Sequence, residues 1–154
     1  MAMTKCIVGF ILLFWGTALV SFIPQDTAPR KIKFNYFSYL ACSDLSEGFI
    51  AKAQFDSMIA LPLCARDTNK NVMTMQSFEI TYAERGLYQD STGLPIIFTD
   101  YTNDRFKGNQ VTKYWIDLFK ERSYKGDTIY IDNVKVLGPD NKSFVCKGMK
   151  WVIQ

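Results

Sequence analysis

Apolar and polar residues alternate along several stretches of the chain, which is typical of β-strands with one buried face. The longest such stretch is VMTMQSFEITYAER, residues 72 to 85, in which the alternation changes parity between Met75 and Phe78. One extra residue in a strand produces such a change, because successive side chains point to opposite faces. We therefore predict a long strand with a β-bulge near Gln76 and Ser77.

A second change of parity lies in IYIDNVKV, residues 129 to 136, between Ile131 and Val134. By the same reasoning it predicts a second bulged strand, with the extra residue at Asp132 and Asn133. An aspartate at this position therefore has a structural reason to be there.

A turn is predicted where this strand ends. Pro139 fixes its own φ, and Asp140 and Asn141 tolerate turn and left-handed conformations. The chain then returns as a closing strand, so that residues 127 to 154 form a hairpin that is central to the fold. Asp127 lies at the strand entry, where short polar side chains are common, and we predict a structural role for it.

The remaining strand signals are shorter. Residues 31 to 41 are predicted to form a strand, and residues 67 to 71, DTNKN, a polar loop. The stretch from Gly86 to Gly108 is rich in turn residues. Within it, one strand is predicted at Leu94 to Thr99, where Pro95 marks an edge strand or the start of a strand.

One segment has a helical period. In NQVTKYWIDLFKER, residues 109 to 122, five apolar residues repeat at spacings of three and four, which places them on one helical face. These residues are Val111, Tyr114, Trp115, Leu118 and Phe119. Asn109 is the predicted N-cap. Upstream, residues 50 to 66 predict a short helix or strand followed by an extended piece.

These elements together predict a mostly β fold. We expect an antiparallel, Ig-like β-sandwich of about seven strands with one amphipathic helix packed on it. The length of 154 residues is that of one domain plus an N-terminal extension. We assign residues 1 to 23 to a signal peptide or anchor, 24 to 48 to a leader strand and linker, and 49 to 154 to the domain.

The N-terminal extension carries the signal for export. Residues 6 to 23 are uncharged and apolar, and they follow Lys5 and the free amine, as in a secretory signal peptide. The same stretch is long enough to form a hydrophobic helix that spans a bilayer. Cleavage and retention as an anchor both stay open. In either case residues 30 to 154 are predicted to lie in the periplasm or at the cell surface, with membrane contact only through residues 6 to 23.

Export allows disulfides. Cys42, Cys64 and Cys146 lie beyond the apolar stretch, so one pair and one free thiol is one arrangement, and three small buried thiols is the other. Connectivity cannot be read from the sequence.

Composition excludes several chemistries. The chain has no histidine, which removes Ser-His-Asp and Cys-His catalysis and histidine-based metal sites. Asp100 and Asp104 share a predicted loop, but no metal-ligand spacing or cofactor motif is present. We predict no catalytic residue, metal or cofactor. The net charge of +3 is dispersed and does not indicate a nucleic-acid partner. Two alternatives stay open: a hydrolase that uses two carboxylates, and a surface module for glycan binding or adhesion.

Three segments carry a resemblance to a known family. KGDTIYIDNVKVLGPDN (125 to 141), MTMQSFEITY (73 to 82) and IAKAQFDSMIALPLCARD (50 to 67) occur in the order and spacing of the C-terminal domain of GldM. GldM is the periplasmic component of the gliding-motility and type IX secretion machinery of the Bacteroidetes. The resemblance covers roughly residues 49 to 154, and Asn141 stands where the family commonly has glycine.

The resemblance implies a β-sandwich in the outer periplasm and a non-enzymatic surface that docks envelope proteins. Partners similar to GldK, GldN or GldL are the ones it implies, whereas the helical bundle and intermediate domains of the family have no counterpart in this sequence. From the residues, the predicted contacts are Tyr88, in an expected loop from Leu87 to Gly93, and the turn at Pro139, Asp140 and Asn141.

Overall fold

The computed structural model describes residues 34–138 and 140–154 of the chain. Its strands are β1 (Tyr36–Tyr39), β2 (Glu47–Ile50), β3 (Cys64–Asp67), β4 (Val72–Gln89), β5 (Pro95–Lys107), β6 (Thr128–Leu137), β7 (Ser143–Val145) and β8 (Met149–Ile153). Its helices are a 3-10 turn, η1 (Leu40–Cys42), and two α-helices, α1 (Lys52–Ile59) and α2 (Lys113–Arg122). The mostly β class is confirmed.

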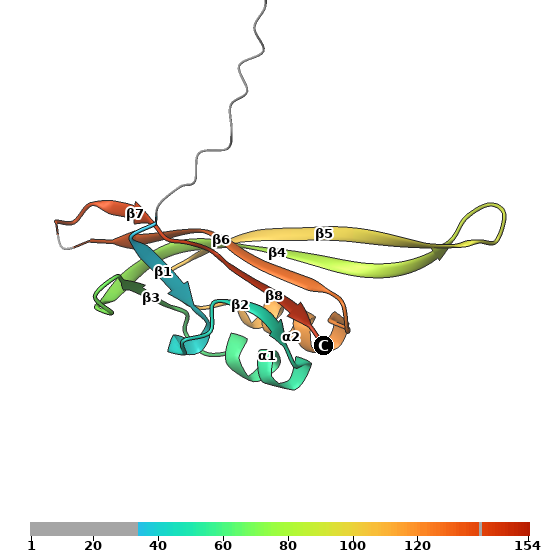
Figure 1. The fold of residues 1–154 in the computed structure, drawn as a ribbon, viewed down its shortest axis with the longest axis horizontal. Helices are drawn as coiled ribbons and strands as arrows, with labels where there is room; N and C mark the ends of the chain where they lie inside the picture. The colour runs from blue at the N-terminus through green and yellow to red at the C-terminus, as the bar shows by residue number, and fades with distance from the viewer. Residues whose placement is uncertain (1–33, 139) are drawn as a thin grey trace, which may run out of the picture. The chain divides into compact units, whose positions relative to one another are not determined.

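All eight strands belong to one sheet (Figure 1). Its order is β1-β3-β4-β6-β8-β2, with β5 added to β4 and β7 added to β6. Every strand pairing is antiparallel except that of β2 with β8, which is parallel. A single parallel bridge also joins Phe37 of β1 to Lys147. The predicted Ig-like sandwich of two stacked sheets is therefore not confirmed. Strand patterning alone says that one face is buried, but not whether a sheet or helices cover it.

One face of the sheet packs on α1 and α2, which lie on the same side of it (Figure 1). The Phe119 ring of α2 is fully buried and meets the Phe55 ring of α1 edge-on, with centroids 5.4 Å apart. It also meets the Tyr82 ring of β4 at 5.6 Å. Such contacts join both helices to the middle of the sheet. Truncating a buried phenylalanine to alanine costs about 3–5 kcal/mol.

Both predicted bulges are confirmed. The pairing of β4 with β6 shifts register between Met75 and Ser77 and again between Ser77 and Glu79. At the second shift, two residues of β6, Asn133 and Val134, lie opposite one residue of β4, so β6 has one extra residue there, and Asn133 has a φ of 50°. Because each bulge reverses the parity, the apolar residues on both sides of it stay on the buried face.

The prediction for α2 was only partly right. The helix begins at Lys113 and not at Asn109, and its N-cap is Thr112, without a side-chain capping hydrogen bond. Asn109 lies in the connection from β5, where its carbonyl oxygen accepts a hydrogen bond from the Leu63 N–H at 2.8 Å. Four of the five predicted face residues are buried, but Tyr114 is 71% exposed, because it lies at the edge of the apolar stripe.

The stretch from Gly86 to Gly108 was predicted to be rich in turns, and this prediction was wrong. The stretch is mostly strand. β4 continues to Gln89, and β5 begins at Pro95 and pairs with β4 over thirteen residue pairs. For Pro95 the sequence left open an edge strand or a strand start, and the structure shows both, but the strand continues to Lys107 and does not end at Thr99. The loop that was to hold Asp100 and Asp104 is part of β5. Most side chains of this edge strand are exposed, so the alternation that marks a half-buried strand is missing from the sequence.

Of the shorter predictions, the DTNKN loop is confirmed and the first strand is only partly right. The DTNKN segment ends β3 and turns into β4, and Asp67 accepts hydrogen bonds from the Asn69 and Asn71 N–H groups. The predicted strand at residues 31 to 41 narrows to β1 followed by η1. The predicted N-terminal hydrophobic helix lies outside the described residues. Within the described part, no helix is long and apolar enough to cross a membrane.

Candidate partner-binding arm

The structure separates the residues predicted to contact a partner. Tyr88 lies on β4 and not in the predicted loop. The strand continues past Tyr88 and ends at Gln89. Asp140 and Asn141 lie in the turn between β6 and β7, at the opposite end of the sheet (Figure 1). They do not share a surface with Tyr88.

The β6–β7 turn has a structural explanation. The Gly138 N–H donates to the Lys142 carbonyl oxygen at 2.8 Å, and the Asn141 N–H donates to the Gly138 carbonyl oxygen at 3.0 Å. Asn141 takes the left-handed conformation, with a φ of 55°, as its residue type predicts. Pro139 lies outside the described residues.

β4 and β5 extend beyond the other strands as a two-stranded arm (Figure 1). The pairing of β4 with β6 ends at Ala83, opposite Thr128, whereas the pairing of β4 with β5 continues to Gln89 and Pro95. We call residues 84 to 100 the arm. A two-stranded ribbon by itself is marginally stable in water, so the arm depends on what holds its base and on what covers its faces.

Both faces of the arm expose large apolar side chains. Leu87 and its cross-strand neighbour Ile97 lie on one face and are 74% and 64% exposed. Tyr88 and its neighbour Ile96 lie on the other face, where the Tyr88 ring meets that of Phe98 with centroids 5.7 Å apart. Apolar groups gathered on an exposed element mark interaction sites more often than isolated ones do.

Sequence reasoning identified Tyr88 and missed its apolar neighbours on the arm. LPIIF, residues 94 to 98, places apolar residues on both parities of a strand that begins with proline. This combination was the available signal, because an edge strand outside the core has no buried face that would require alternation.

The turn at the tip of the arm is ordered by Asp90. Its Oδ1 atom accepts hydrogen bonds from the N–H groups of Thr92, at 2.8 Å, and Leu94, at 2.9 Å, and from the Thr92 hydroxyl at 2.7 Å. The Thr92 side chain, together with these N–H groups, lowers the pKa of the Asp90 carboxyl. The Asp90 carboxylate thus shapes the hairpin turn, and its Oδ1 atom is engaged in the hydrogen bonds of that turn.

The base of the arm is held by Asp127, which is 1% exposed. Its Oδ2 atom accepts from the Tyr82 hydroxyl at 2.6 Å and from the Tyr124 N–H at 2.8 Å, and its Oδ1 atom accepts from the Arg85 N–H at 2.8 Å. Burial, followed by the hydrogen bond and charge of Asp127, raises the pKa of Tyr82. Asp127 therefore joins β4, where the arm begins, to the segment after α2. This confirms its predicted structural role.

A pair of carboxylates with opposite pKa shifts lies on β4 and β6. Glu79 and Asp132 are cross-strand partners. Burial, and then the Glu79 charge, raises the pKa of Asp132, whereas the pKa of Glu79 is lowered by hydrogen bonds from Asn133 first and then from Arg105. Both Glu79 oxygens are occupied by these two partners. These hydrogen bonds hold the Glu79 carboxylate in place, and its charge acts on Asp132.

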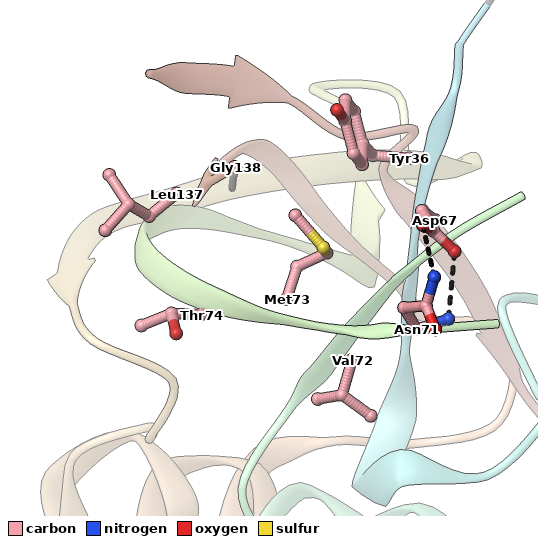
Figure 2. Close-up of a pocket in the computed structure, with 8 residues that line it drawn as sticks. All are labelled: Tyr36, Asp67, Asn71, Val72, Met73, Thr74, Leu137 and Gly138. Atoms are coloured by element: carbon pink, nitrogen blue, oxygen red, sulfur yellow. Dashed lines mark hydrogen bonds between the residues drawn. The ribbon is translucent and has the colours of Figure 1, made fainter. Parts of the chain in front are cut away.

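The cavity in Figure 2 lies near the β6–β7 turn and measures about 460 Å³. Its walls are the side chains or backbone of Tyr36, Asp67, Asn71, Val72, Met73, Thr74, Leu137 and Gly138. The one carboxylate among them, Asp67, is held by the Asn71 N–H and side-chain amide, both at 2.9 Å (Figure 2). Hydrogen bonding from Asn71 lowers its pKa. The other side-chain polar groups of the lining, besides Asn71, are the hydroxyls of Tyr36 and Thr74.

Of the described aromatic residues, Tyr88 and Phe98 are exposed and in contact, but no other tyrosine and no tryptophan lies on that face of the arm. Tyr88 and Tyr101 point to opposite faces of the hairpin, since they lie at positions of different parity in the β4–β5 register. Tyr114 is on α2 and Tyr124 follows it. The described tryptophans, Trp115 and Trp151, are buried. Among residues 34–138 and 140–154, no cluster of side chains suited to a metal ion occurs either.

Cys42 and Cys64 form a disulfide, with Cα atoms 4.8 Å apart, that ties η1 to the start of β3. Of the described cysteines, Cys146 is free, and burial raises the pKa of its thiol to about 12. The arrangement of one pair and one thiol is the first of the two that the sequence left open.

Comparison with known proteins adds no family assignment, because no protein-family model and no curated protein matches the chain.

Proposed function

We propose that this chain is a non-enzymatic, exported protein-binding module of the bacterial cell envelope that docks its partners through the β4–β5 arm. The observation that carries the proposal is the exposure of apolar side chains on both faces of the arm, at Leu87 and Ile97 on one face and Tyr88 and Phe98 on the other. A monomer gains nothing from holding these groups in water, whereas a partner that covers them gains the free energy of burying apolar surface.

The location is argued from two features. The apolar stretch of residues 6 to 23 is of the type that directs export. The disulfide between Cys42 and Cys64 supports an oxidising compartment, because such bonds are rare where thiols are kept reduced. Both favour the periplasm or the cell surface.

The family proposal rests on the sequence resemblance to the GldM C-terminal domain. It suggests partners similar to GldK, GldN or GldL and a relation to gliding motility or type IX secretion. An Ig-like sandwich, as in that family, is also only a proposal for this chain, since a second sheet would have to pack on the single sheet described above.

The test is capture of partners from the envelope. A tagged full chain is crosslinked in the cells that express it naturally, and the captured proteins are identified for the wild type, for Tyr88→Ser and for Tyr114→Ser. Tyr88 and Tyr114 are 60% and 71% exposed, so neither change opens the core, but only the first lies on the arm. We expect Tyr88→Ser to lose captured proteins that wild type and Tyr114→Ser retain.

The outcomes separate the parts of the proposal. Recovery of GldK-, GldN- or GldL-like proteins in an arm-dependent way supports the family relation as well as the docking surface. Arm-dependent recovery of unrelated envelope proteins supports the docking surface and argues against the family relation. Equal capture by all three variants rules out the arm as the docking site.

A further inference from the structure

The outer edge of β5 has no neighbouring strand among the described residues. β5 pairs with β4 on one side over its thirteen residues, and it is joined to no other strand. Its unpaired N–H and C=O groups form a template for another strand. Pro95 ends this edge on one side, and the charged residues Asp104, Arg105 and Lys107 lie near its other end. The segment between them, residues 96 to 103, holds a single charge, at Asp100.

We infer that a second copy of this chain occupies this edge, with β5 pairing antiparallel to β5 across a two-fold axis. The inference deepens the proposed function and rests on the same arm, since it names a second copy as the first partner. The two-stranded arm becomes part of a four-stranded ribbon, in the order β4-β5-β5-β4. Ribbons of three or more strands with an apolar face are stable where two-stranded ones are not.

The charges restrict the register. In a two-fold pair, residue i meets residue j while j meets i. A ribbon centred on Asp100 sets this residue against itself, and one centred on Thr102 sets Asp100 against Asp104. Both place like charges directly opposite each other, which is unfavourable.

A ribbon centred on Thr99 avoids these repulsions. It sets Thr99 against Thr99 and, on each side of the axis, Ile97 against Tyr101 of the other copy. Threonine pairs and aromatic–β-branched pairs are among the favourable cross-strand neighbours. Ile97 and Tyr101 lie on the same face of β5 and are 64% and 63% exposed. Centring on Tyr101 would instead set Ile97 against Arg105, whose guanidinium is already paired with Glu79.

The ribbon also merges the apolar faces of the two arms. Leu87 and Ile97 of one copy are continued by Tyr101 of the other copy on one face. Tyr88, Ile96 and Phe98 of both copies lie on the opposite face. The surface offered to a further envelope protein is then built by two chains.

The first assay is the mass in solution of the full chain, purified in a mild detergent so that residues 6 to 23 do not themselves drive association. The variants are Ile97→Lys, at the free edge, and Leu87→Lys, its neighbour on the same face but on β4. We expect a wild-type dimer of twice 17.7 kDa. Ile97→Lys weakens it by about 2- to 30-fold, because two cross-strand pairs are lost, and Leu87→Lys leaves it unchanged.

The second assay tests the register. Thr99→Cys is expected to form a crosslinked dimer under mild oxidation, whereas Ser91→Cys, at the exposed tip of the arm, is not. A monomeric wild type at the highest soluble concentration, equal weakening by both lysine variants, or equal crosslinking by both cysteine variants overturns the inference. Tyr88→Ser keeps the edge intact, so a loss of capture with that variant and an intact dimer are separate results. The dimer can therefore be disproved while the docking proposal is supported, and the docking proposal can be disproved while the dimer is observed.

Discussion

Replacing Asp127 by asparagine tests how much of the stability depends on one buried carboxylate. The side chain is 1% exposed and accepts three hydrogen bonds, from the Tyr82 hydroxyl, the Tyr124 N–H and the Arg85 N–H. An asparagine of the same shape keeps one accepting oxygen and presents an NH₂ group in place of the other. In its better orientation, the NH₂ group faces the Arg85 N–H, so one donor is left opposite another donor.

The expected cost follows from these contacts. A hydrogen bond to an ionised group is worth about 1.5–3 kcal/mol, and a buried donor without a partner adds a further penalty, so Asp127→Asn should lose about 2–4 kcal/mol of unfolding free energy. Small domains are stable by only about 5–15 kcal/mol, so this loss is a large share. The measurement is urea unfolding of the full chain, with Asp140→Asn as the control. Asp140 is exposed in a turn, and its change should stay within about 0.5 kcal/mol.

A second readout locates the effect. Because the Arg85 N–H lies at the base of the arm and donates to Asp127, its hydrogen exchange and that of the arm amides should accelerate in Asp127→Asn more than exchange in β8 does. The reasoning is refuted if Asp127→Asn unfolds within about 0.5 kcal/mol of the wild type, or if exchange rises uniformly over the sheet.

Three further predictions concern titration, backbone space and the disulfide. Burial raises the pKa of Tyr82 in the folded state, so its contribution to stability is complete below the unfolded value of about 10 and is lost as the pH rises above it; the alkaline loss of unfolding free energy should shrink in Tyr82→Phe. Gly148→Ala should cost about 1–3 kcal/mol, because a Cβ there would lie 2.7 Å from a backbone carbonyl oxygen, while Gly86→Ala, which has room, should cost nothing or add stability; equal unfolding midpoints would contradict this. Replacing Cys42 and Cys64 together by serine opens a loop with a sequence separation of 22 and should lower the unfolding free energy by about 3 kcal/mol; an unchanged value under oxidising conditions would show that the bond is not formed.

Hydrogen bonds account for the positions of several carboxylates among the described residues. Asp67 and Asp90 each hold a turn, Asp127 holds the base of the arm, and Glu79 is bound by Asn133 and Arg105. These four carboxylates therefore hold β4 and the segments next to it in place.

Local features were determined by the sequence alone. The bulges beside Met75 and Asn133, the left-handed Asn141 and the start of β5 at Pro95 were all predictable. Each depends on the parity of a few neighbouring residues or on the conformational limits of one residue type, and neither requires knowledge of distant parts of the chain.

Only the tertiary structure decided the rest. In the described residues, α1 and α2 pack on the buried face of a single sheet. Asp127 is buried and accepts hydrogen bonds from both β4 and the segment after α2 because these two segments meet there. Cys42 and Cys64 form a disulfide because η1 lies beside β3. The length of the arm could not be predicted from the sequence either. β5 pairs with β4 over thirteen residues at an exposed edge, and an exposed strand needs no alternation of apolar and polar residues. The role of each of these residues depends on its contact partner in a distant segment of the chain. Only the folded structure shows which segment that is.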